Sequence, residues 1–280
     1  MIDRDSLRWP GDAPLAVVVV ICLEAVEWEP HDGVAPPGAR GAVYPRAFDP
    51  TVLSLHEYGN RVGVFRVLDV LDRLGIPGTA AADALSAERR PFVLEECAAR
   101  GFAFAGRGTS ASRMVTELET EEDERSAIER CLTAIERVTH SRPRGWFSTG
   151  YGESTRTLAL LAEAGVRYVC DWPNEEQPYR IGDLVSLPPA LDLDDELALR
   201  LRSLPVGQWV EMVARAAARL AADGADSGRL LVLPLHPYVV GQPFRIRYLE
   251  RALAAVAGRD DVWLATADDV VAHVDARPQP

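Results

Sequence analysis

Long apolar runs alternate with amphipathic segments along most of the chain. The runs at 15–23 and 230–235 contain no polar side chain, which predicts two strands that are buried on both faces. Pro234 weakens the second prediction slightly, because proline fits poorly inside a sheet. Shorter runs predict further strands at 76–82, 102–107, 143–147, 167–172, 184–187 and 262–265.

Helical spacing of apolar residues fills most of the intervals between these strands. It predicts helices at 64–74, 91–100, 117–139, 154–164, 206–222, 247–257 and 267–274, with Thr266 capping the last one. The Pro- and Gly-rich segment 29–50 predicts a long loop. Seven or eight strand–helix units without a linker indicate an α/β protein with one barrel domain over residues 1–280.

Polar side chains stand where several predicted strands end. His236 is followed by Pro237, which lacks an amide hydrogen and therefore ends the strand. Chemistry in α/β barrels lies at the carboxyl ends of the strands. The predicted site residues are therefore Glu24, Glu27, Arg107, Trp146, Asp171, Trp172 and His236.

Each of these residue types suits a different task. Histidine titrates near neutrality, and burial beside Trp28 or Trp172 would raise the pKa of Glu24, so Glu24 and His236 are the candidate acid–base catalysts. Arg107 can donate to a carbonyl or an anion, and Trp146 and Trp172 can flank a planar ligand. Each residue also has a structural alternative: a solvated acid, a salt-bridged arginine, packed tryptophans or a turn-capping histidine.

Composition narrows the class of partner. The net charge of −12 argues against nucleic acid and anionic membranes, which both require clustered Lys and Arg. No apolar stretch approaches the roughly 18 residues of a membrane span, and the run at 16–23 lacks the basic leader of a signal peptide. The four cysteines are scattered without metal-ligand spacing, as in reduced cytosolic proteins. We expect a cytoplasmic protein that acts on a small molecule.

Several motifs carry a family resemblance. They are Trp9-Pro10, the strand that ends at Glu24, Tyr58-Gly-Asn-Arg-Val-Gly63, Arg142-Pro-Arg-Gly-Trp146, Tyr168 to Trp172 with Gln177-Pro-Tyr179, and His236-Pro-Tyr238 through Gly241-Gln-Pro243 to Tyr248. The chain resembles the polysaccharide deacetylase superfamily, in the branch with metal-independent allantoinases and cyclic imide hydrolases. The resemblance implies a distorted seven-stranded (β/α) barrel and, by analogy, a homo-oligomer.

Two departures from the family pattern bear on the mechanism. Family members have two aspartates after the first strand, whereas this chain has Glu24-Ala-Val-Glu27. The family's two metal-binding histidines correspond to Arg107 and Ala111, and no other histidine pair has ligand spacing. We therefore predict that the protein uses no catalytic metal and no cofactor.

Three functional hypotheses follow. The first is metal-independent hydrolysis of a non-peptide C–N bond in a cyclic amide, imide, ureide or N-acyl group, with Glu24 and His236 as acid–base groups. The second is a non-hydrolytic acid–base reaction of small-molecule biosynthesis, such as isomerisation, elimination or cyclisation. The third is a binding protein that retains the barrel without catalysis, because a fold alone does not fix a function.

Overall fold

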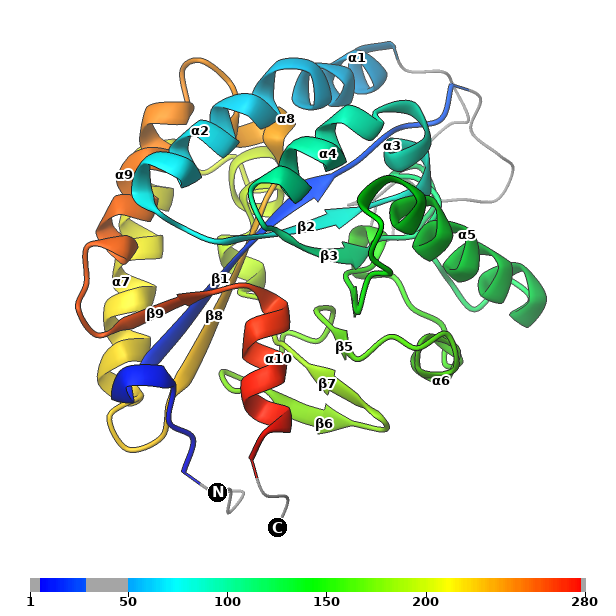
Figure 1. The fold of residues 1–280 in the computed structure, drawn as a ribbon. Coiled ribbons are helices and arrows are strands. Elements are labelled where there is room, and N and C mark those ends of the chain that lie inside the picture. Colours follow the sequence, from blue (N-terminus) through cyan, green and yellow to red (C-terminus); the bar gives the residue numbers. More distant parts are fainter. Residues whose placement is uncertain (1–5, 29–49, 278–280) are drawn as a thin grey trace.

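Seven parallel strands form a curled sheet in the order β7-β5-β4-β3-β2-β1-β8 (Figure 1). This computed structural model describes residues 6–28 and 50–277, so all of the predicted loop except Pro50 lies outside the described residues. The strands are β1 (Leu15–Leu23), β2 (Gly78–Ala82), β3 (Ala103–Gly106), β4 (Gly145–Trp146), β5 (Tyr168–Val169), β7 (Leu184–Ser186) and β8 (Arg229–Leu235).

Two further strands complete the sheet. β6 (Tyr179–Ile181) pairs antiparallel with β7 at the outer edge. β9 (Val262–Ala265) pairs with the first half of β1, while β2 pairs with its second half. Pro189 bridges Val232 of β8, so the segment after β7 brings the two ends of the curled sheet together. The predicted distorted (β/α) barrel is thus confirmed.

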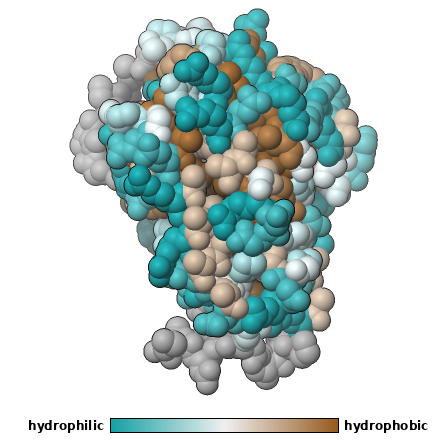
Figure 2. Space-filling view, turned by 90° about the vertical axis from the view of Figure 1, so that its left-hand side faces the viewer, coloured by the Kyte–Doolittle hydropathy of each residue, from teal (hydrophilic) through white to brown (hydrophobic). Residues whose placement is uncertain are grey.

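The helices cover the outer face of this sheet, except α10 (Ala267–Asp275), whose buried residues Ala267, Val270 and Val271 belong to the inner hydrophobic cluster. The helices are α1 (Pro50–Tyr58), α2 (Val64–Leu74), α3 (Ala84–Arg89), α4 (Pro91–Ala99), α5 (Glu121–Thr139), α6 (Thr157–Glu163), α7 (Val206–Asp223), α8 (Pro237–Val240), α9 (Ile246–Ala257) and α10. On the side of the molecule where α7 and α9 lie, polar and apolar residues are intermixed over the surface (Figure 2). No described helix is both long enough and apolar enough to span a membrane.

The alternation of side chains along β1 separates two hydrophobic clusters. Leu15, Val17, Val19, Ile21 and Leu23 pack in the larger cluster beneath the helices. Ala16, Val18, Val20 and Cys22 belong to the smaller cluster inside the barrel. Because successive side chains of a strand point to opposite faces, Glu24 continues the inner row and reaches the barrel mouth.

Several elements differ from those predicted. β4 and β5 are shorter than 143–147 and 167–172, because Ser148 leaves the ladder and donates its backbone N–H to Asp171. The short helices α3 and α8 were not predicted, and neither was β6, since such segments hold too few residues for a clear apolar period. Helix α1 was also not predicted, and none of its residues is buried. Pro234 lies inside β8. One edge of this strand pairs with β1 and the other is bridged only at Val232, so the missing N–H of Pro234 is tolerated.

The motif at 58–63 fixes the helical layer onto the barrel mouth. Gly59–Gly63 forms a π-helical turn between α1 and α2 that packs against α8. A Cβ atom at Gly63 would lie 2.2 Å from the carbonyl oxygen of Pro237. The side chain of Asn60 donates a 2.7 Å hydrogen bond to the carbonyl oxygen of Glu24. The motif therefore attaches the start of α2 to both strand ends that carry the candidate catalysts.

We predict that Gly63→Ala lowers the free energy of unfolding by about 1–3 kcal/mol, because the new methyl group meets backbone that cannot move aside. Urea unfolding measures the change. Gly207→Ala in α7 is the matched control: no atom lies within 4 Å of its added Cβ, and we expect it to be neutral or to stabilise by up to about 1 kcal/mol. Equal effects of the two substitutions would contradict the close packing inferred at Gly63.

Candidate active site

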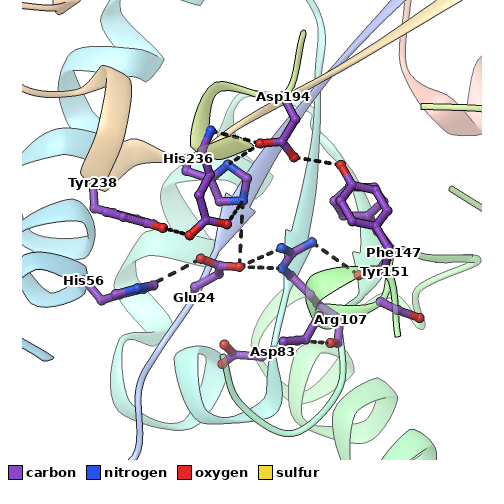
Figure 3. Close-up of polar contacts among 12 residues, drawn as sticks. Glu24, His56, Asp83, Arg107, Phe147, Tyr151, Asp194, His236 and Tyr238 are labelled. Atoms are coloured by element: carbon purple, nitrogen blue, oxygen red, sulfur yellow. Dashed lines mark hydrogen bonds and ion pairs between the residues drawn. The ribbon is translucent and has the colours of Figure 1, made fainter. Parts of the chain in front are cut away.

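A buried ion pair between Glu24 and Arg107 lies at the mouth of the barrel (Figure 3). Glu24 directly follows β1 and Arg107 directly follows β3, and their side chains are 4% and 3% exposed. Nε and Nη2 of Arg107 donate hydrogen bonds of 2.9 and 2.6 Å to the same oxygen, Oε1 of Glu24. Nη1 points to the carbonyl oxygen of Phe147 at 3.4 Å, and the guanidinium lies over the Phe147 ring.

The ion pair decides the charge of Glu24. Burial by itself would raise the pKa of this carboxyl group. The positive charge of Arg107, with contributions from His236 and His56, instead lowers the pKa of Glu24 to about 2. Glu24 is therefore an ionised carboxylate at neutral pH, opposite to the raised pKa that the sequence suggested.

His236, at the end of β8, forms a second charged pair with Asp195. Nδ1 of His236 lies 2.7 Å from Oδ1 of Asp195, and its backbone N–H also donates to that carboxylate. Asp194 approaches the same ring nitrogen to 3.7 Å and accepts a 2.7 Å hydrogen bond from the hydroxyl of Tyr151. Nε2 of His236 is buried, makes no hydrogen bond within the described part of the chain, and lies 3.9 Å from Oε1 of Glu24.

The acidic neighbours favour a protonated His236. Burial opposes the charge, but Cys22 and the carboxylates of Asp194, Glu24 and Asp195 raise the pKa of His236 well above its ordinary value. Burial raises the pKa of Asp195 to about 6, an effect that His236 limits. At neutral pH the two residues form an imidazolium–carboxylate pair, with Nδ1 bound to Asp195 and Nε2 facing Glu24.

His56, on α1, reaches the second oxygen of Glu24. Its Nδ1 lies 3.7 Å from Oε2 of Glu24, and its ring stacks on Tyr238 with centroids 4.1 Å apart. Burial, partly offset by Glu24, lowers the pKa of His56 to about 4, so its imidazole is neutral at pH 7. At the end of β2, Asp83 accepts hydrogen bonds from the backbone of Ala25 and Ser86, which holds the residue after Glu24 in place.

The remaining predicted residues lie outside this cluster. Asp171 accepts 2.7 and 2.9 Å hydrogen bonds from the backbone and hydroxyl of Ser148, and the indole N–H of Trp146 donates to the same hydroxyl at 2.9 Å. Trp146 is buried in the outer hydrophobic cluster, so its ring packs beneath the helices and does not line the mouth. This hydrogen-bonded chain supports β4 and β5.

Trp172 and Glu27 occupy other parts of the rim. Trp172 is 39% exposed, and its indole N–H donates to Glu153. The backbone N–H of Glu27 donates to the hydroxyl of Ser112, and the hydroxyl of Ser110 donates to Oε1 of Glu27 at 3.2 Å. Of the seven residues predicted for the site, the structure brings together Glu24, Arg107 and His236.

Sequence reasoning missed His56 and the roles of Asp194 and Asp195. The two aspartates lie in the segment after the predicted strand at 184–187, which is a signal that could have suggested a partner for His236. His56 belongs to a helix that was not predicted, and only the packing of α1 against α8 brings it to Glu24. No spacing in the sequence indicates that contact.

The residues present do not fit a divalent metal. Asp194, Asp195 and His236 are the described group whose ligand atoms lie close enough to share one. Asp195 is held by His236, whereas Asp194 accepts from Tyr151 and from the backbone N–H groups of Glu196 and Leu197. The guanidinium of Arg107 already supplies a positive charge at Glu24. The donors are therefore committed to hydrogen bonds within the chain.

Comparison with known proteins agrees with this architecture. The polysaccharide deacetylase family model matches residues 48–169. PuuE allantoinase is 26% identical, with a TM-score of 0.86, and the match covers 98% of this chain and 95% of that one. A Pseudomonas aeruginosa PAO1 structure named for polysaccharide deacetylases is also 26% identical, with a TM-score of 0.85 over 97% of this chain and 94% of that one.

A Schizosaccharomyces pombe protein that is also named as a polysaccharide deacetylase is 24% identical, over 95% of this chain and 92% of its own length. Together these matches confirm the resemblance to the polysaccharide deacetylase superfamily, and PuuE allantoinase supports the allantoinase-like branch. They support a hydrolase of this family.

We predict that the imidazoles of His236 and His56 carry opposite charge states between pH 5.5 and 7.5. His236 should stay protonated because its pKa is raised, and His56 should stay neutral because its pKa is lowered to about 4. Nitrogen NMR shifts of the imidazoles report both, with His236→Gln and His56→Gln providing the assignments. A midpoint near 6.5 for either ring would contradict the charge pattern described here.

Proposed function

We propose that the protein is a metal-independent hydrolase of a non-peptide C–N bond in a small cyclic amide, imide or ureide, or in an N-acyl group. The observation that carries this proposal is the unpartnered ring nitrogen of His236 beside Glu24. Nε2 of His236 is buried without a hydrogen-bond partner among the described residues and faces an ionised carboxylate oxygen 3.9 Å away. A buried donor of this kind requires an acceptor, which a substrate would supply.

The charges assign complementary roles to the two residues. Glu24 orients a water molecule and accepts its proton as the water oxygen bonds to the carbonyl carbon. Its low pKa makes it a weak base, so the proton moves only as the attacking water becomes acidic. His236, held by Asp195, donates its Nε2 proton to the nitrogen as the C–N bond breaks. One water is consumed. Glu24 then transfers the proton that it took from the water to His236, so both residues regain their initial charge.

The charge balance supports an uncharged substrate. Glu24, Asp194, Asp195 and Glu196 all lie within 4.0 Å of Arg107 or His236, so the two cations already have carboxylate partners within the chain. The N–H groups of Arg107 already point to Glu24 and Phe147, so they do not provide an anion site. The chain is similar to PuuE allantoinase, whose name refers to a cyclic ureide substrate, and this similarity supports a cyclic ureide or a related compound as the substrate.

We predict that chelator-treated protein hydrolyses a cyclic ureide or imide from a small panel, with a product heavier by one water. Glu24→Gln should lower kcat/KM by about a hundredfold or more, since it removes the group that accepts the proton. Added Zn²⁺ should change the rate by less than about twofold, because Glu24 and His236 carry out both proposed proton transfers without a metal.

Glu211→Gln, on the exposed surface of α7, is the matched control and should keep wild-type activity. Circular dichroism and urea unfolding establish that Glu24→Gln remains folded, since that substitution also breaks a buried ion pair. Full activity of folded Glu24→Gln would contradict the assigned role. A product of unchanged mass would instead favour the non-hydrolytic acid–base reaction.

A further inference from the structure

His56 holds a polar atom at the candidate site that lacks a partner. Nδ1 of its ring is buried and makes no hydrogen bond to any described residue. It lies 3.7 Å from Oε2 of Glu24, which is beyond hydrogen-bonding distance. The side chain is 11% exposed, so bulk water reaches little of it. Such an atom in a folded protein calls for an explanation, and a bound ligand is one.

The same feature occurs on the other side of Glu24. Nε2 of His236 is also buried and lacks a hydrogen bond within the described residues, and it lies 3.9 Å from Oε1. Two unpartnered imidazole nitrogens thus face the two oxygens of one ionised carboxylate (Figure 3). The arrangement suits a ligand with several polar atoms, of which one meets each imidazole.

The ring of His56 is held in this orientation by its packing. It stacks on Tyr238. The guanidinium of Arg200 also lies over the Tyr238 ring, 5.4 Å from its centroid. The hydroxyl of Tyr238 donates to Glu196, which fixes the tyrosine. A Cβ atom at Gly59 would lie 2.7 Å from Cβ of Tyr238, so the glycine brings α1 close enough for the stack.

The charge around His56 decides which atom it can offer. The imidazole is neutral at pH 7 and carries one ring proton, because burial and the nearby cations outweigh the attraction of Glu24. The carboxylate of Glu24 favours the tautomer with that proton on Nδ1. A neutral N–H donor suits a carbonyl oxygen, whose developing negative charge it stabilises during attack at the carbon.

We propose that His56 is a substrate-binding residue whose Nδ1–H donates a hydrogen bond to the carbonyl oxygen of the bound cyclic amide, imide or ureide. This inference rests on the proposed function and adds to it a third side chain in contact with the reacting group. Glu24 and His236 carry the proton transfers, while His56 orients and polarises the carbonyl. Arg107 then acts through Glu24 and is a positioning residue.

The test compares His56→Asn with His56→Leu. The two replacements have nearly the same shape and both remove the ring, but only asparagine keeps a nitrogen donor close to the position of Nδ1. We expect kcat/KM for hydantoin or succinimide to be at least tenfold higher for His56→Asn than for His56→Leu, with equal stability in urea. Equal kcat/KM values for the two folded variants would overturn the inference, even if Glu24→Gln is inactive and the proposed function stands.

A binding measurement separates this inference from the proposed function. Calorimetry gives Kd for hydantoin and succinimide with the wild type and both variants. If the wild type binds one of them without turnover, the proposed hydrolysis fails, and tenfold weaker binding by His56→Leu than by His56→Asn still supports the contact. If the wild type neither hydrolyses nor binds either compound, both proposals are overturned for this substrate class.

Discussion

The buried ion pair between Glu24 and Arg107 is the constraint around which the site is arranged. Either charge alone in this position would be strongly unfavourable, because burial removes the water that stabilises it. The pair fixes the carboxyl ends of β1 and β3 relative to each other and keeps Glu24 ionised. A negative charge on Glu24, in turn, favours the proton on His236. The charges of the site therefore depend on one another.

The barrel brings these groups together through the alternation of side chains. Inner residues of β1 are apolar up to Cys22, and Glu24 is the next inward position after them. β8 pairs with β1 from its first residue to Ile21, which places His236 beside that position. The glycines of the π-helical turn then seat α1 against α8, so His56 approaches from the helical layer. Each charged group is supplied by a different element, and only tertiary packing makes them neighbours.

The sequence predicted the features that depend on local pattern. The apolar runs ending at Glu24 and before His236 located two groups of the site, because a strand with parallel neighbours must end at the mouth. The partner of Arg107 stayed open between a ligand and a salt bridge, and the structure shows the salt bridge to Glu24. Trp146 could not be assigned to one face from the sequence, because its strand pairs over only two residues. His56 depends on glycine contacts between distant segments, which no local pattern records.

A double-mutant cycle on the unfolding free energy tests the central claim most directly. Glu24→Gln and Arg107→Met are measured singly and together in urea. Each single substitution leaves one buried charge without its partner and should cost about 3–5 kcal/mol. The loss of unfolding free energy in the double variant should be smaller than the sum of the two single losses by more than about 1 kcal/mol, since the two residues form one interaction. Additivity to within about 0.5 kcal/mol would contradict the account, because it would mean that the two charges do not depend on each other.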